Sequence, residues 1–90
     1  MKTVRIFISG TVQGVFFRAF IQENAENLGL TGYVRNLEDD RVEAVFEGYE
    51  NDVNRMIEVC KRGPLHSKIK DIEIEKISNQ GFDTFKILRI

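Results

Sequence analysis

The stretch VRIFISGTVQGVFFRAFIQENAENLG, residues 4–29, changes its apolar spacing halfway along. In its first part Val4, Ile6 and Ile8 alternate with other residues, which predicts a half-buried strand. From about residue 15 the spacing becomes helical, and one apolar stripe holds Phe17, Phe20, Ile21, Ala25 and Leu28. Gly29 is placed to end this helix as a C-terminal cap. The stretch therefore predicts a strand, a tight loop and a helix in direct succession.

The later elements repeat the alternation of strands and helices. The predicted segments are strands at 31–36 and 41–47 with a turn between them, a helix at 50–62, a strand at 68–77 and a last short strand at 82–90. The order β-α-β-β-α-β plus a C-terminal strand predicts an α+β, ferredoxin-like split βαβ sandwich. We expect a mostly antiparallel sheet with both helices on one face, strands 1 and 3 at its centre, and residues 31–36 on an edge.

Length and composition set limits on the function. Ninety residues, 42% hydrophobic and 30% charged, fit one globular domain over residues 1–90. A net charge of −1 argues against a general nucleic-acid binder, and Cys60 has no second cysteine for an internal disulfide. No metal-ligand cluster stands out, and the first residues lack the apolar run of a signal peptide. We expect a cytoplasmic protein with no metal, cofactor, membrane or nucleic-acid partner.

Charge is unevenly distributed along the chain. Residues 1–22 contain Lys2, Arg5 and Arg18 and no acid, whereas residues 38–52 contain seven acids against Arg41 alone. A local positive field can attract a small anion even when the whole molecule is slightly negative. The N-terminal third is therefore the candidate region for an anion site.

The segment from Gly10 to Arg18, GTVQGVFFR, lies where the first strand gives way to the helix. Free N–H groups at a helix start, together with the helix dipole, favour an anion, and glycines let the backbone approach it closely. The segment matches neither the Walker A loop nor the dinucleotide fingerprint. It predicts a cradle for a small phosphate-like group.

Two polar residues each fit two roles on the residues alone. Arg18 is either a solvated surface side chain or a fork of donors that reaches back over the loop to phosphoryl oxygens. Asn36 is either the residue that opens the turn before Leu37 or a site residue.

A family resemblance favours the functional role for both. The segment Gly10 to Arg18 resembles the first signature of the acylphosphatase family, and the run from Gly32 to Asn36, continued from Val42 to Gly48, resembles the second. The resemblance implies metal-independent hydrolysis of an acyl phosphate to a carboxylate and inorganic phosphate, by in-line attack of water.

The resemblance also implies the roles of individual residues. Arg18 and Asn36 would be catalytic, with Asn36 orienting the water. The phosphate-binding set would be Gln13, Gly14, Val15, Phe16, Phe17 and Arg18. We expect a monomer with a small-molecule acyl phosphate as its substrate. One position departs from the family, because Asp40 stands where glycine is usual; aspartate tolerates a left-handed turn better than most residues.

Two alternatives share this fold. One is a non-catalytic module that binds a small anion of the carbamoyl-phosphate type. The other is an RNA-binding module, in which aromatic residues on the sheet stack against bases. Residues 41–46 lack the ribonucleoprotein motif, and Glu43 and Glu47 would repel a phosphate backbone.

Overall fold

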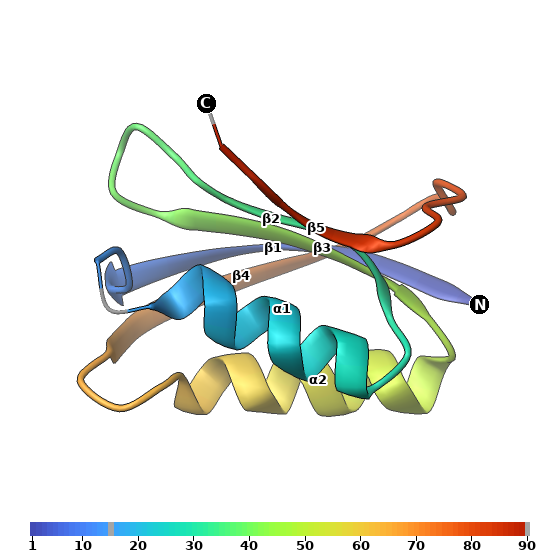
Figure 1. Ribbon diagram of the computed structural model, residues 1–90, viewed down its shortest axis with the longest axis horizontal. Helices are drawn as coiled ribbons and strands as arrows, with labels where there is room; N and C mark the ends of the chain where they lie inside the picture. Colours follow the sequence, from blue (N-terminus) through green and yellow to red (C-terminus); the bar gives the residue numbers. More distant parts are fainter. Residues whose placement is uncertain (15, 90) are drawn as a thin grey trace.

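A computed structural model describes residues 1–14 and 16–89 of the chain. Two helices pack side by side under one face of a five-stranded sheet (Figure 1). The elements are β1 (Lys2–Thr11), α1 (Phe17–Asn27), β2 (Thr31–Asn36), β3 (Val42–Gly48), α2 (Glu50–Arg62), β4 (Lys68–Ile77) and β5 (Phe85–Leu88). The predicted α+β, ferredoxin-like arrangement is confirmed. Within the described residues, neither helix has the length and apolarity needed to cross a membrane.

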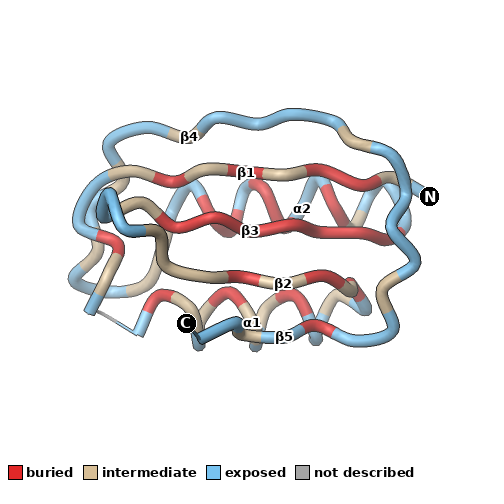
Figure 2. The backbone as a smooth tube through the Cα atoms, turned by 90° about the horizontal axis from the view of Figure 1, so that it is seen from above, coloured by how far each residue is buried: buried red, intermediate tan, exposed pale blue. Residues whose placement is uncertain are grey.

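The sheet has the strand order β4-β1-β3-β2-β5 (Figure 2). Neighbouring strands are antiparallel except for β2 and β5, which are parallel. The predicted central position of the first and third strands is confirmed. The predicted edge position of residues 31–36 is wrong, because β5 pairs along the outer side of β2. This added strand bears directly on the functional site.

The core lies between the sheet and the helices. Val4, Ile6 and Ile8 of β1 are at most 1% exposed, as their alternation predicts. From α1 the core receives Phe17, Ile21 and Ala25, with Phe20 and Leu28 packed at its margin. Cys60 is fully buried in α2, and burial raises the pKa of its thiol. These contacts fix α1 on the sheet, and with it the position of its first turn.

Both ends of β2 are fixed by local turn chemistry. Before β2, α1 ends where Gly29 adopts a left-handed φ of 71° and the Leu30 N–H donates to the Ala25 carbonyl at 2.9 Å. After β2, Asp40 takes a left-handed φ of 70° in the hairpin to β3. The Asp39 carboxylate accepts a hydrogen bond from the Arg41 N–H in the same turn. Aspartate therefore adopts the turn conformation that glycine would otherwise supply.

The carboxylate of Glu47 holds the segment before β5 against the sheet. It accepts a 2.7 Å hydrogen bond from the Thr3 hydroxyl, a 2.9 Å bond from the Gly81 N–H, and further bonds from the N–H groups of Gln80 and Phe82. Glu47 is only 6% exposed. Burial acts to raise the pKa of its carboxyl group, but the donors outweigh it, so the pKa lies below its ordinary value of 4.5.

This contact predicts an acid-sensitive contribution to stability. A pKa lowered by folding stabilises the protein above the unfolded-state value and stops doing so as the pH falls through the native value. Glu47→Gln should lower the free energy of unfolding at pH 7 by about 1–3 kcal/mol. The gap to wild type should narrow below pH 4.5 in urea titrations. The exposed Glu23→Gln should change stability by less than about 0.5 kcal/mol; a constant gap at all pH values would contradict the account.

Candidate active site

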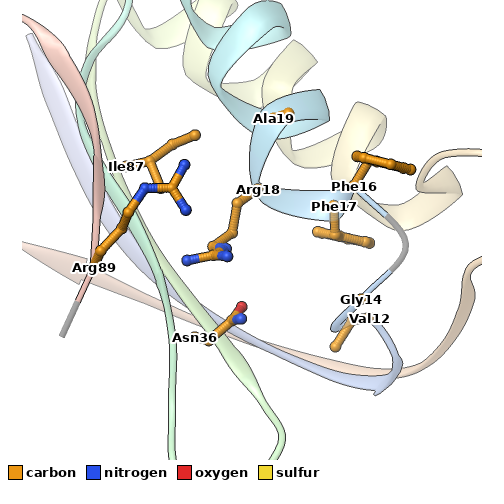
Figure 3. Close-up of a pocket in the computed structure, with 9 residues that line it drawn as sticks. All are labelled: Val12, Gly14, Phe16, Phe17, Arg18, Ala19, Asn36, Ile87 and Arg89. Carbon is orange, nitrogen blue, oxygen red and sulfur yellow. The ribbon is translucent and has the colours of Figure 1, made fainter.

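A cavity of about 350 Å³ opens where the β1–α1 loop, the end of β2 and the end of β5 meet (Figure 3). It is lined by Val12, Gly14, Phe16, Phe17, Arg18, Ala19, Asn36, Ile87 and Arg89. Among these described residues the polar side chains are two guanidinium groups and one amide, and none is a carboxylate. The donor set suits an anion.

The first turn of α1 presents free donors. Phe16 is the N-cap residue directly before α1, and its carbonyl accepts the first helical hydrogen bond, from the Phe20 N–H at 3.0 Å. The amides of Phe17, Arg18 and Ala19 precede that bond and so have no acceptor within the helix. The Phe16 side chain makes no capping hydrogen bond, and the first turn contains no acid. A bound anion would satisfy these amides and complement the helix dipole.

The loop before the helix adopts left-handed backbone at two described positions. Gly14 has φ 75°, and a side chain there would meet nothing within 4 Å, so the glycine is required by conformation and not by crowding. Phe16 has φ 59° and ψ 27°, a conformation that costs a non-glycine residue about 1–2 kcal/mol. Its side chain is 87% exposed. Backbone strain of this kind gathers at functional sites.

Arg18 lies in the first turn of α1 and its side chain points into the cavity (Figure 3). A cation is unfavourable at this end of a helix, since the dipole there is positive. The ion pairs among the described residues do not include it. A planar guanidinium next to free amides forms one continuous set of donors for a tetrahedral anion.

Asn36 is the last residue of β2 and pairs with Val42 across the ladder to β3. It follows Val34 on the face that the helices cover, and its side chain extends toward Arg18 (Figure 3). Its Oδ1 atom is buried and accepts no hydrogen bond from the described residues. A buried acceptor without a donor is unfavourable in a folded protein unless a ligand or water satisfies it. The structure thus brings together two residues whose proximity the sequence did not establish.

Gln13 does not line the cavity, and its side chain connects the β1–α1 loop to the β2–β3 hairpin. Its side-chain amide donates to the Leu37 carbonyl at 3.0 Å and to the Arg41 carbonyl at 2.9 Å. These carbonyls bracket the β2–β3 hairpin, which begins directly after Asn36. The cavity is lined by four of the predicted phosphate-binding residues: Gly14, Phe16, Phe17 and Arg18. Gln13 is not among the lining residues, and Val15 lies outside the described residues.

Arg89 and Ile87 line the cavity and are absent from the sequence-based prediction. β5 pairs with β2 in the parallel register, with Val34 opposite Ile87 and Arg35 opposite Leu88. Alternation along the predicted final strand would have put Ile87 and Arg89 on one face. Only the parallel pairing with β2 brings that face to the site.

The comparisons with known proteins agree with an α+β enzyme of this architecture. The sequence model of the acylphosphatase family matches residues 4–87. An acylphosphatase of Rubrobacter xylanophilus is 51% identical over 89% of this chain and 73% of its own length. An acylphosphatase of Haloarcula marismortui is 46% identical over 91% and 90%. The crystal structure of the Bacillus subtilis acylphosphatase superposes with a TM-score of 0.96 at 40% identity, covering 99% of this chain and all of that one.

The chain therefore belongs to the acylphosphatase family, as its two signatures indicate, and is an enzyme that hydrolyses acyl phosphates.

The Gln13 contacts predict a loss of turnover without a loss of anion binding. Gln13→Met keeps the length of the side chain and removes both donors, so the hairpin that carries Asn36 loses its tie to the loop. We expect kcat to fall about 5–10-fold and the inhibition constant of inorganic phosphate to change less than about 3-fold. Gln80→Met is the matched control, because the exposed Gln80 amide donates to Ser78. Wild-type kcat in Gln13→Met would contradict the positioning role.

Proposed function

We propose that the cavity holds the phosphoryl group of the acyl phosphate on the amides that begin α1 and on Arg18, while Asn36 places the attacking water. The observation that carries this proposal is the buried Oδ1 of Asn36, which has no donor among the described residues and belongs to a side chain that lines the same cavity as Arg18. Gly14, Phe16 and Phe17 supply backbone donors on the loop side. Gln13 and Val15 remain predicted phosphate ligands.

The reaction follows from these positions. A water molecule that donates a hydrogen bond to Asn36 Oδ1 attacks phosphorus. The bond from phosphorus to the acyl oxygen breaks, and a carboxylate and inorganic phosphate leave. The carboxylate is a good leaving group, so positioning and charge stabilisation supply most of the catalysis. No side chain among the described residues that line the cavity can act as a base near neutral pH. The proton of the water passes to a phosphoryl oxygen or to solvent.

The chemistry of the cavity wall favours a metal-free reaction. Magnesium prefers carboxylate, carbonyl and water oxygens. The described wall offers two guanidinium groups, which repel a cation and neutralise the phosphoryl charge directly, and its one amide side chain gives magnesium a single oxygen ligand. Arg18 then does what a metal ion does in other phosphoryl-transfer enzymes.

We further propose that the protein is a monomer, that it binds no nucleic acid, and that it works in the cytoplasm. The residues that line the cavity form it without a contribution from a second copy of the chain. The open face of the sheet carries Glu43 and Glu75, which pair with Arg5, so this face offers RNA no excess of positive charge. The single, buried Cys60 fits a reducing compartment.

The test is hydrolysis of benzoyl phosphate by the wild type and two variants, with and without EDTA. We expect EDTA to change nothing. Asn36→Ala should lower kcat about 100-fold or more with the inhibition constant of phosphate nearly unchanged, because Asn36 contacts only the water. Arg18→Ala should abolish both turnover and phosphate inhibition, because its guanidinium binds the anion.

Three results would contradict the proposal. They are loss of wild-type activity in EDTA with recovery in magnesium, wild-type turnover by Asn36→Ala, and retained phosphate inhibition in Arg18→Ala. Wild-type protein that binds phosphate and does not hydrolyse the substrate would instead favour the non-catalytic anion-binding alternative.

A further inference from the structure

The pairing of strands in the sheet places Arg89 at the cavity. It follows Leu88, the residue of β5 that pairs with Arg35, just as Asn36 follows Arg35 in β2. The two parallel strands therefore deliver Asn36 and Arg89 to the same end of the sheet. Phe85 is buried in the core, with its ring stacked on Phe46 at 5.6 Å between centroids, and this contact fixes the strand.

Arg89 provides a second cation in the cavity, in addition to Arg18. Figure 3 shows Arg18 between Arg89 on one side and the β1–α1 loop on the other. A phosphoryl group bound to the loop amides therefore meets Arg18 before Arg89. The part of the substrate that extends away from the loop, past Arg18, is the acyl group.

The wall around Arg89 combines apolar and cationic surface. Ile87 precedes Arg89 by two residues and lines the same cavity, half-buried against the core. Methylene groups of a short acyl chain can pack on Ile87, and a carboxylate at the end of that chain can pair with the Arg89 guanidinium. Two guanidinium groups in one cavity repel each other, and a ligand with two separate anionic ends relieves this repulsion.

We propose that Ile87 and Arg89 form an acyl subsite, and that Arg89 favours acyl phosphates whose acyl group ends in a second carboxylate. This inference rests on the proposed function, since it takes the phosphoryl group to lie at Arg18 and the loop. The substrate class is the monophosphate of a short dicarboxylic acid, in which the mixed anhydride and the free carboxylate are separated by a few methylene groups.

The test compares two acyl phosphates of equal chain length, succinyl phosphate and butyryl phosphate, which differ in the terminal carboxylate. The measured quantity is the ratio of their kcat/KM values, after subtraction of spontaneous hydrolysis. Arg89→Gln should reduce the ratio about 5-fold, through loss on succinyl phosphate, with butyryl phosphate changed less than about 2-fold. Arg89→Lys should retain part of the preference, because it keeps the charge and loses the fork of donors.

Lys86→Gln is the matched control. It removes the same charge three residues earlier in the chain, within β5, at a residue that does not line the cavity, so it should leave the ratio unchanged. An equal loss on both substrates in Arg89→Gln would show that Arg89 serves the phosphoryl group and would overturn the subsite. An unchanged ratio would overturn it as well. Wild type that hydrolyses neither compound would overturn the proposed function, and the subsite with it.

Discussion

The amides of the first turn of α1 have no acceptor within the helix, and a cation, Arg18, stands beside them where an acid would normally complement the dipole. Phe16, the residue directly before this helix, has a left-handed backbone conformation, and its side chain makes no capping hydrogen bond. The amide donors of the first turn therefore stay available. A helix end of this kind is unfavourable in isolation and becomes favourable when an anion binds. The rest of the structure holds these donors and the other residues of the cavity in fixed positions.

The sheet supplies the remaining groups from the ends of two parallel strands. β2 ends at Asn36 and β5 leads to Arg89, and the Glu47 carboxylate secures the segment that leads into β5. Gln13 links the β1–α1 loop to the hairpin after Asn36. The Asn36 side chain and the free amides of the first turn of α1 are therefore held by different elements but fixed to each other. Such fixed positioning suits a reaction with a good leaving group, in which orientation contributes most of the rate.

Local patterns in the sequence predicted most of the fold. The spacings of β1, α1 and α2 identified the buried faces, and the segments 31–36, 50–62 and 68–77 match the structure residue for residue. The start of α1 was placed two residues early, since periodicity cannot show that Phe16 turns left-handed. The pairing of β5 with β2 was missed because a four-residue strand with a parallel partner has no local signature.

The site followed from the sequence only in part. The loop and Arg18 were identified by residue type and position, and Asn36 by resemblance. Gln13 stays a predicted phosphate ligand, but the hydrogen bonds from its side chain to backbone carbonyls of the hairpin were not predicted, because they depend on two segments that meet in space. Arg89 was missed for the same reason, because its place in the site is set by strand order and register and not by its neighbours in sequence.

The measurement that tests the central claim most directly is a titration of ¹⁵N-labelled protein with inorganic phosphate, followed by amide NMR. The account predicts that the amides of Gly14, Phe16, Phe17 and Arg18 shift together, saturate with one common Kd, and stop responding in Arg18→Gln. Shifts confined to other parts of the chain, or an unaltered response in Arg18→Gln, would contradict the claim that the first turn of α1 and its arginine form the anion site.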